Sequence, residues 1–387
     1  MCINTQRIEA TEKLEEALNL MLSGRSCVIR GRAGTGKSTL IKKFAEESLY
    51  PIIRTAPTGV ASLNIDGQTI SSLLRLGIYN YSDQEIKEKN EYNYIPPESI
   101  LVIDESFGLN AQQMNQVDIA LRSATGIDEI FGGLQIILAG DDCQLLSHEE
   151  GDHWQHESFF KELPSIELSY SFRHENDSLF LKYLNQLRSS IKSCTPLNLE
   201  IWWKSILPHL SEVNTTDRLI IAPFFDEAKK INSTKQKLLS CTKKTIVLEA
   251  ESYGPNPQGM PYFRQEISLD TPVIHTLNRN GLINGSMGVV THIESEEEVY
   301  VTFNGDSMST RILMEDVFTA GDYSGAYYVP LLPAFSLTAR KVQGLTLKDG
   351  VISKTFLSIK ESNENMRRLY VAMSRFTTLD KIKVYSH

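Results

Sequence analysis

The sequence contains few cysteines and no long apolar run. Only five of its 387 residues are cysteine, and no two form a C-x-x-C pair, which argues against a zinc site and a disulfide framework. No apolar stretch approaches the roughly 20 residues that a membrane-spanning helix needs. Residues 1–11 also lack the apolar centre of a signal peptide. We therefore expect reduced, structural thiols and a protein of the cytoplasm or a similar compartment, with no membrane partner.

An excess of positive charge is also absent. The 39 Lys and Arg residues are outnumbered by 48 Asp and Glu, which gives a net charge of −9. An average conceals local fields, however. Residues 338–387 hold ten Lys or Arg against four Asp or Glu, an excess of six, although such runs are usually solvated faces. Charge alone therefore does not decide whether the chain binds nucleic acid.

The length and the 41% apolar composition predict two or three globular domains.

A phosphate-binding loop lies near the N-terminus, where residues 31–39 read G-R-A-G-T-G-K-S-T. A β-branched run at 26–30 precedes it and a stretch with helical spacing at 40–49 follows it, which is the strand, loop and helix context that this motif requires. We expect Lys37 to reach the β- and γ-phosphates and the Ser38 hydroxyl to bind Mg²⁺. A structural glycine-rich turn is the alternative, and the flanks disfavour it. The predicted nucleotide-binding residues are Gly34, Thr35, Gly36, Lys37, Ser38 and Thr39.

Further apolar runs at 51–55, 100–103 and 134–138 alternate with segments of helix length, which predicts a parallel α/β sheet; a helix is expected at 10–23. In such a sheet function gathers where strands end. Asp104 and Glu105 follow one run, and we expect Asp104 to position Mg²⁺ and Glu105 to act as the base for water. Gln144 follows the next run and is placed to sense the γ-phosphate. A helix start at 104–105 and a simple turn at 140–142 remain alternatives.

The pattern changes in the second half of the chain. A second α/β unit is expected to begin with the strand at 166 and to include a strand at 218–222. Five short strands then follow at 245–249, 272–276, 288–292, 299–303 and 311–314, divided by turn residues, which predicts a small inserted β-barrel. Helical and mixed sequence resumes at 335–343, and a strand at 382–385 closes the chain.

Six segments follow the phosphate loop in the order of known helicase motifs. In that order they resemble the superfamily-one DNA helicases of the 5′-to-3′ branch, most closely the Pif-type group, which is also similar to RecD-type and phage Dda helicases. The segments are T-A-P-T-G-V-A-S at 55–62 (motif Ia), F-G-G-L-Q at 131–135 leading into G-D-D-C-Q-L at 140–145 (motif III), Arg173 (motif IV), N-G-S-M-G at 284–288 (barrel turn), K-V-Q-G-L-T at 341–346 (motif V) and Y-V-A-M-S-R at 370–375 (motif VI).

The resemblance implies an α/β fold of two RecA-like phosphate-loop domains with a small wedge insertion and an inserted Src-homology-3-like β-barrel. The expected division is a first RecA-like domain at 1–165, with the wedge at about 78–97. A second RecA-like domain spans 166–244 and 323–387, and the barrel spans 245–322. The implied activity is an ATP- and Mg²⁺-dependent DNA helicase that translocates 5′-to-3′ on single-stranded DNA.

The resemblance also assigns roles to residues. Arg173 and Arg375 would be arginine fingers, reaching the γ-phosphate from the second α/β unit across a cleft. For Arg375 a surface salt bridge is the alternative. The implied sets are as follows: catalytic Lys37, Asp104, Glu105, Gln144, Arg173 and Arg375; nucleotide-binding Gly344 in addition to the loop; metal-binding Ser38 and Asp104; and DNA-binding Thr58, Gly59, Ser72, Asn284, Thr338 and Lys341.

The expected partners are single-stranded and forked DNA, with a monomer as the basic unit, no named protein partner and a cytoplasmic or nucleoid-associated location. Two rival functions remain open: a nucleotide-gated DNA-binding factor that hydrolyses ATP without unwinding, and a small-molecule kinase built on the same loop. The chain also departs from the family pattern. Leu14 stands where the adenine-reading glutamine is usual, and Ser71 and Arg340 replace family histidines.

Several polar and aromatic residues have ordinary structural explanations. The group Asp152, His153 and His156 is not a complete metal-ligand set. The pair at 202–203, two tryptophans, is expected to be core rather than a stacking platform. In the wedge interval, four tyrosines at 79, 81, 92 and 94 could stack on a terminal base pair, or could simply pack on the sheet.

Overall fold

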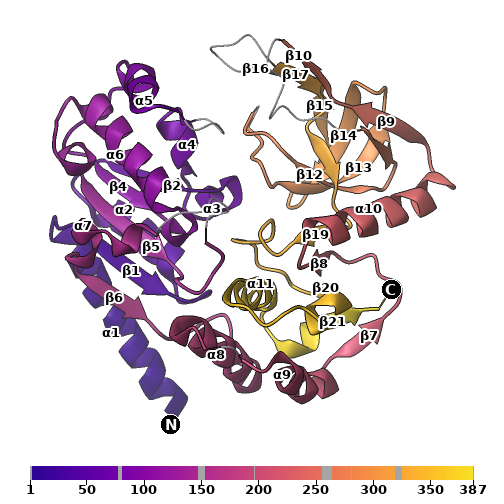
Figure 1. The fold of residues 1–387 in the computed structure, drawn as a ribbon, viewed down its shortest axis with the longest axis horizontal. Coiled ribbons are helices and arrows are strands. Elements are labelled where there is room, and N and C mark those ends of the chain that lie inside the picture. Colours follow the sequence, from indigo (N-terminus) through magenta and orange to yellow (C-terminus); the bar gives the residue numbers. More distant parts are fainter. Residues whose placement is uncertain are drawn as a thin grey trace. The chain divides into compact units, whose positions relative to one another are not determined.

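The computed structural model describes residues 2–76, 81–146, 153–195, 197–254, 264–279, 281–318 and 325–386. Contacts within the chain divide it into two compact units (Figure 1). The first unit comprises Met1–Leu210, Gln343–Lys348 and Ile359–Lys381, and the second comprises Ser211–Val342, Asp349–Ser358 and Ile382–His387. The expected three-part division at 165, 244 and 322 stays a prediction. Among the described helices, none combines the length and apolar character needed to cross a bilayer.

The first unit is built on a six-stranded sheet in the order β3-β2-β4-β5-β1-β6. Every neighbouring pair is parallel, which confirms the predicted parallel α/β arrangement. The strands are β1 (Cys27–Gly31), β2 (Ile52–Ala56), β3 (Gln68–Thr69), β4 (Ile100–Ile103), β5 (Gln135–Gly140) and β6 (Ser165–Leu168).

Both faces of this sheet are covered by helices, and its strands are accordingly apolar throughout. Alternate residues serve opposite faces. On β1, Val28 packs with the cluster that contains α6 residues, whereas Cys27 and Ile29 pack with α1 and α2. The helices of the first unit are α1 (Cys2–Leu22), α2 (Lys37–Glu47), α3 (Gly59–Asn64), α4 (Ile70–Leu73), α5 (Asp83–Asn90), α6 (Ala111–Thr125), α7 (Ser158–Lys161), α8 (Ser178–Ser193), α9 (Leu199–Ile206) and α11 (Asn363–Ser374).

Short 3₁₀ turns complete the first unit at η1 (Ser106–Gly108), η2 (Ile130–Gly133), η3 (Trp154–His156), η4 (Leu207–His209) and η6 (Leu379–Lys381). The expectation of core tryptophans is confirmed. Trp202 and Trp203 in α9 are both buried, and their ring centroids lie 4.8 Å apart.

The second unit contains a second parallel sheet, in the order β19-β8-β20-β21-β7. Its strands are β7 (Ser211–Val213), β8 (Ile220–Ala222), β19 (Ser336–Thr338), β20 (Gly350–Ser353) and β21 (Ile382–Tyr385), and α10 (Phe225–Ser240) and η5 (Lys354–Leu357) belong to the same unit. Of the helical and mixed sequence expected at 335–343, the helical part is wrong, because Ser336–Thr338 forms a strand beside β8 and turn residues follow it. The strand expected to open the second α/β unit at 166 is β6, which instead pairs with β1 in the first sheet.

Antiparallel strands make up the rest of the second unit. One sheet has the order β15-β14-β13-β12-β18, and smaller sheets pair β11 with β9 and arrange β10-β17-β16. The five predicted short strands are confirmed, each within a residue or two, and a core around Val273, Val290 and Val301 holds them together. Closure into an Src-homology-3-like barrel stays a prediction. The strands are β9 (Thr245–Glu249), β10 (Glu251–Tyr253), β11 (Arg264–Ser268), β12 (Pro272–His275), β13 (Met287–Ile293), β14 (Glu298–Phe303), β15 (Thr310–Leu313), β16 (Glu315–Phe318), β17 (Gly325–Tyr328) and β18 (Leu331–Pro333).

The interval expected to form a wedge contains helix α5, while residues 77–80, including Tyr79, lie outside the described residues. Ser82 and Glu85 form a reciprocal capping box at the start of α5. Ile86 on this helix is fully buried in the core of the first unit. Tyr92 and Tyr94, which follow α5, are 82% and 75% exposed. The wedge role stays a prediction.

Candidate nucleotide and nucleic-acid site

The phosphate loop runs from β1 into α2, as its motif predicts. Gly34 and Gly36 have φ of +77° and +89°, and a Cβ at Gly34 would lie 2.3 Å from the Cβ of Arg173. Position 34 therefore tolerates only glycine. No side chain caps α2, so the N–H groups of its first turn remain available to an anion. Lys37, the first residue of α2, donates from Nζ to the carbonyls of Gly31 (2.7 Å) and Arg32 (3.1 Å), which keeps its charge at the loop.

A cavity of about 270 Å³ lies against this loop, entirely within the first unit. All six predicted catalytic residues line it, as do the predicted nucleotide-binding residues. Four lining residues were missed by sequence reasoning: Ala33, Ala61, Asn64 and Thr346. Thr346 belongs to the motif V segment and could have been found there, whereas Asn64, whose Nδ2 donates to Gly344 O at 3.0 Å, carries no sequence signal. The complete lining is Ala33, Gly34, Thr35, Gly36, Lys37, Ser38, Thr39, Ala61, Asn64, Asp104, Glu105, Gln144, Arg173, Gly344, Thr346 and Arg375.

Two adjacent carboxylates form one wall. The Ser38 hydroxyl donates to Asp104 Oδ2 at 3.3 Å, and the Glu105 N–H donates to Asp104 Oδ1 at 2.9 Å. Burial raises the pKa of Asp104, against the opposing effect of Lys37. Burial and the neighbouring Asp104 raise the pKa of Glu105 to about 7. Glu105 also has φ of +51°, a conformation that costs a non-glycine residue about 1 kcal/mol and is found at functional sites.

This wall fits a magnesium ion. A hydroxyl and a buried carboxylate 3.3 Å apart offer the hard oxygen ligands that Mg²⁺ prefers. A buried carboxylate pair without a cation is electrostatically unfavourable, which the raised pKa values express. Ser38 and Asp104 are therefore the residues that would hold the metal.

Two arginines line the cavity together with the carboxylates. Arg173 donates to Ser374 O (3.1 Å) and Thr346 Oγ1 (2.7 Å), and burial, with Arg375 nearby, lowers its pKa to about 10. Arg375 is 2% exposed and donates to Val371 O, Leu345 O and Ser374 Oγ. Burial lowers the pKa of Arg375 too.

Within the described residues neither arginine forms an ion pair with a carboxylate. The surface salt bridge considered for Arg375 is therefore wrong, since the side chain is buried and bonded to carbonyl and hydroxyl oxygens. The approach of Arg173 across a cleft is also wrong. Arg173 follows β6 in the first sheet, and the Phe172 N–H donates to Gly34 O at 2.8 Å. Desolvated cations that form no direct ion pair among the described residues favour an anionic ligand.

Gln144 completes the cavity. Its Nε2 lies 3.5 Å from Glu105 Oε1, a long contact. Its Oε1 is buried and has no hydrogen-bond partner among the residues that the structure describes. An unpaired buried acceptor is costly, and this oxygen is out of reach of solvent as the side chain lies.

The predicted DNA contacts fall in both units. In the first, Thr58 caps α3 by accepting from the Ala61 N–H, Gly59 is buried beside it, and Ser72 is exposed on α4. In the second, the Lys341 N–H donates to Thr338 Oγ1 at 3.4 Å, so these two lie together.

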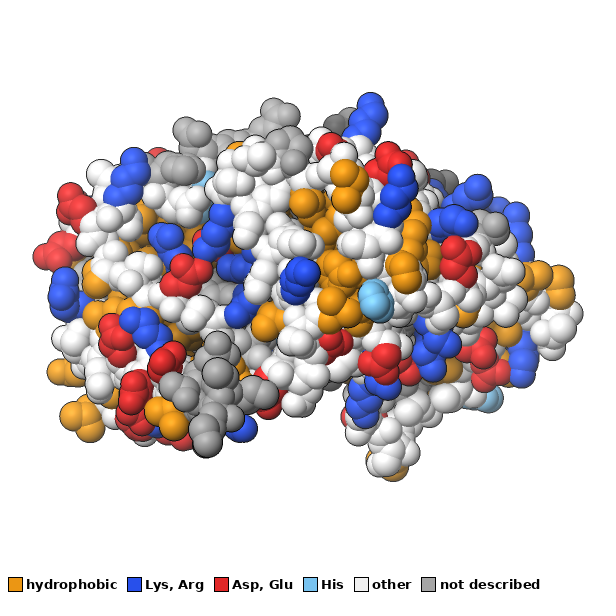
Figure 2. All heavy atoms as spheres, turned by 90° about the horizontal axis from the view of Figure 1, so that it is seen from below, with side chains coloured by type: hydrophobic (Ala, Val, Ile, Leu, Met, Phe, Trp, Pro, Cys, Tyr) orange, Lys and Arg blue, Asp and Glu red, His pale blue; other side chains and the backbone are white. Residues whose placement is uncertain are grey.

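Asn284, also in the second unit, lies in the turn before β13, where its N–H donates to Asn278 Oδ1 at 2.8 Å. On the face drawn in Figure 2, basic and acidic side chains are interspersed.

The environment of the expected base-binding position is apolar. A Cβ placed on Gly36 would meet Leu14 Cδ2 at 3.6 Å and Phe172 Cε2 at 3.8 Å. Leu14 thus lies beside the phosphate loop, as its alignment with the family glutamine predicts, but offers no hydrogen bond to a base.

His153, from the group considered as a metal site, stacks on the Phe107 ring, and its Nε2 lies 3.2 Å from the Phe107 carbonyl oxygen. Asp152 and the His156 side chain lie outside the described residues.

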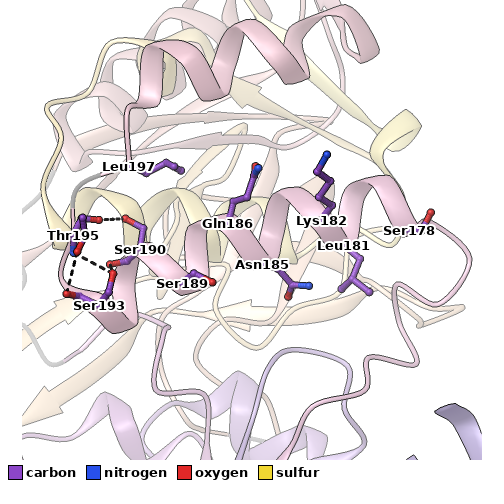
Figure 3. A pocket seen from close by; sticks show the side chains of 10 residues that line it. All are labelled: Ser178, Leu181, Lys182, Asn185, Gln186, Ser189, Ser190, Ser193, Thr195 and Leu197. Carbon is purple, nitrogen blue, oxygen red and sulfur yellow. Dashed lines mark hydrogen bonds between the residues drawn. The ribbon is translucent and has the colours of Figure 1, made fainter.

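A larger groove of about 760 Å³ runs along α8 (Figure 3). Its lining is mostly serine, amide and leucine side chains, and Ser190, Ser193 and Thr195 bond to one another at its end. Among the described residues that line the groove Lys182 is the single charged one, so they offer no acid–base pair. The smaller cavity at the phosphate loop is therefore the better candidate for chemistry.

Comparison with known proteins agrees with this geometry. The family model described as PIF1-like helicase matches residues 2–196, half of the chain. The chain belongs to the PIF1-like helicase family. The ATP-dependent DNA helicase PIF1 of Xenopus laevis is 24% identical over 412 residues, covering 98% of this chain and 62% of that protein. PIF4 of Trypanosoma brucei brucei is 33% identical over 151 residues, covering 36% of the chain and 18% of that protein. The chain thus spans less than two thirds of these family members.

Solved structures of the PIF1-like family share the fold. Pif1 helicase from Candida albicans superposes with a TM-score of 0.78 at 22% identity, covering 97% of this chain and 94% of that one. Pif1 helicase from Bacteroides, in complex with ADP-AlF3 and ssDNA, gives 0.77 at 22% identity, covering 97% and 92%. The predicted α/β fold with two RecA-like domains is confirmed.

Proposed function

We propose that the chain is an ATP- and Mg²⁺-dependent DNA helicase that translocates 5′-to-3′ on single-stranded DNA and separates duplex DNA. One observation carries the proposal: Lys37, Asp104, Glu105, Gln144, Arg173 and Arg375 all line one small cavity. Three cations and two carboxylates around a glycine-rich loop are the parts that phosphoryl transfer to water needs. The family, whose curated members are ATP-dependent DNA helicases, supports the same conclusion.

Each side chain has a role in hydrolysis. Lys37 and the first turn of α2 bind the phosphates, and Ser38 and Asp104 would hold Mg²⁺, which would neutralise charge on the phosphate oxygens. Arg173 and Arg375 stabilise the negative charge that develops on the transferred group, because they are preorganised and desolvated. Gly344 contacts the nucleotide from the motif V segment.

Water activation falls to Glu105 and Gln144. Glu105 accepts the proton of the attacking water, because its carboxylate lines the cavity beside Gln144. Gln144 orients that water from the lining of the cavity, where its Nε2 lies 3.5 Å from Glu105 Oε1. Gln144 is buried and Glu105 is half-buried, so bulk solvent competes little for their hydrogen bonds.

DNA is the proposed polymer substrate. Bacteroides Pif1 has been crystallised bound to ssDNA, and another neighbour is described as unwinding forked dsDNA through two coordinating Pif1 helicases. We assign Thr58, Gly59, Ser72, Asn284, Thr338 and Lys341 to contacts that are mostly with phosphates and carry little sequence information. The basic unit is proposed to be a monomer.

Steady-state ATP hydrolysis with and without single-stranded DNA tests the proposal. We expect Mg²⁺-dependent hydrolysis that DNA stimulates, and loss of both basal and stimulated rates in Glu105→Gln. Exposed Glu47, at the end of α2, provides the matched control Glu47→Gln, which should hydrolyse ATP at the wild-type rate. Hydrolysis that DNA does not change, or transfer of phosphate to a small molecule, would contradict it.

A further inference from the structure

The turn that presents Gln144 is held from outside by two helices. This β5 turn, residues 141–144, follows β5 and is closed by hydrogen bonds from the Cys143 N–H to Asp141 Oδ1 (3.1 Å) and from the Gln144 N–H to Asp141 O (3.1 Å). Gln144 is the one residue of the turn that lines the nucleotide cavity. The other three face α8 and α11, which belong to the same compact unit.

Asp141 is the first point of attachment. Its side chain is fully buried and accepts from Arg188 Nη1 on α8 and from the Tyr370 hydroxyl on α11, the latter at 2.7 Å. Arg188 Nη1 also donates to the Tyr370 oxygen at 3.0 Å, which closes a three-membered network. Burial acts to raise the pKa of Asp141, but Arg188 and Lys37 lower it below its ordinary value. The carboxylate is therefore ionised, and its oxygens are committed to these bonds.

Arg367 provides the second attachment. Its Nη1 donates to Asp142 O at 2.6 Å and to Gln144 O at 2.7 Å, so one guanidinium nitrogen joins two carbonyls of the turn. Its Nε donates to Asn363 Oδ1 at 3.1 Å on the same helix, which fixes the side chain. Such bonds from a charged donor are about twice as strong as neutral ones.

A metal site is the competing explanation for this cluster, because Asp141, Asp142 and Cys143 could offer three ligand atoms within 4.8 Å of one another. The geometry disfavours it. Asp141 already bonds a guanidinium and a phenol, and Asp142 lies 3.4 Å from both Arg188 Nη2 and Lys192 Nζ. Burial also raises the pKa of the Cys143 thiol, so that ligand would be protonated. A metal ion would have to displace the charged groups of Arg188 and Lys192.

We propose that Tyr370, Arg188 and Arg367 are positioning residues that set the place of Gln144 through the β5 turn. α11 carries Tyr370 and Arg367, and the chain continues directly into Arg375. One helix therefore fixes both the water-orienting amide and an arginine finger in the same cavity. This inference rests on the proposed hydrolysis at that cavity and extends it to residues that do not line it.

Tyr370→Phe tests the inference because it removes one oxygen and keeps the packing. We expect kcat for ATP hydrolysis to fall by up to about 10²-fold, since small misplacements of catalytic groups have effects of this size. KM for ATP should change little, because the phosphate loop is untouched. Tyr183→Phe is the matched control: Tyr183 lies on α8, and its hydroxyl bonds Ser205 O at 2.8 Å, away from the cavity.

A double variant separates positioning from general destabilisation. In a Gln144→Ala background, Tyr370→Phe should cause no further fall in kcat, because the residue it positions is already gone. Arg367→Met is the second variant, and the chain should still fold because Arg367 is half-exposed. This variant should also lower kcat in the wild-type background. In the Gln144→Ala background it should cause no further fall.

An unchanged kcat in both single variants, or equal falls with and without Gln144, would overturn the inference. Absence of hydrolysis in the wild-type chain would instead overturn the proposed function, so the two failures are distinguishable.

Discussion

His174 Nε2 donates a hydrogen bond of 2.9 Å to the carbonyl oxygen of Phe376, the residue after Arg375. The carbonyl can only accept, so Nε2 carries a proton; Nδ1 lies 2.8 Å from the Ser171 hydroxyl, which is also 3.1 Å from Ala33 O. Two further bonds hold the preceding carbonyls, one from Arg173 to Ser374 O and one from the Leu347 N–H to Arg375 O. The end of α11 is thus bonded at three successive carbonyls.

This arrangement predicts a pH dependence of stability. Burial, with additional effects of Arg173, Arg32 and Arg375, lowers the pKa of His174 from 6.5 to about 4. Between these values the unfolded chain binds a proton that the folded chain does not, so stability falls as pH falls from 6.5 toward 4. At about 1.4 kcal/mol per pKa unit, the largest loss is roughly 3 kcal/mol. His174→Gln should reduce this slope in urea unfolding measured at several pH values. Parallel profiles for the two proteins would contradict the assignment.

Lys37→Ala should abolish ATP hydrolysis and leave the fold intact. The substitution removes a charge at the phosphate loop, and the side chain bonds only two carbonyls of that loop. Lys42→Ala on the same helix is the control. Lys42 forms an exposed ion pair with Asp66, so this variant should hydrolyse ATP at the wild-type rate. Hydrolysis rates and thermal melting would be measured together. Comparable turnover in Lys37→Ala would exclude the phosphate-loop assignment.

Arg375→Ala should lower kcat by roughly 10³ to 10⁵, the effect of losing an arginine finger, with a weaker effect on nucleotide affinity. Because Arg375 is buried and bonded to three oxygen atoms, we also expect a lower melting temperature. Arg368→Ala, a half-buried arginine on the same helix, controls for loss of a guanidinium. A variant that loses thermal stability yet hydrolyses ATP at the wild-type rate would exclude the finger role.

The exposed tyrosines after α5 test the wedge. Replacing the whole of 80–93 would remove buried Ile86 and the bonds of Asn90 to Leu74 O and Ile86 O, so point variants are sharper. Tyr92→Ala with Tyr94→Ala should leave DNA-stimulated hydrolysis unchanged and reduce fork unwinding. Tyr50→Ala, at another exposed tyrosine, is the control. Equal loss of both activities would indicate a structural role, and retention of both would place the wedge elsewhere.

Local signals explain what the sequence could predict. The phosphate loop, the strands around it and Asp104 were predictable because each follows from contiguous residues. The capping box of α5 was equally visible, since Ser82 and Glu85 stand three residues apart before an apolar position, and it would have predicted a helix in the wedge interval.

Non-local pairing explains what the sequence could not predict. β19 has three residues and becomes a strand because β8, more than a hundred residues earlier, lies beside it. β6 joins the first sheet for the same kind of reason, through pairing with β1. The contacts of Arg367 with the β5 turn span 223 and 225 residues. No motif links those positions, so only the folded chain reveals them.

Unwinding of forked DNA by the wild-type chain tests the central claim most directly. A labelled fork with one single-stranded tail would be mixed with the protein, ATP and Mg²⁺, and strand separation would be followed over time, with Lys37→Ala as the inactive reference. We predict separation of the fork with a 5′ tail and not of the fork with a 3′ tail. Hydrolysis of ATP that single-stranded DNA stimulates, with neither fork separated, would contradict the helicase assignment.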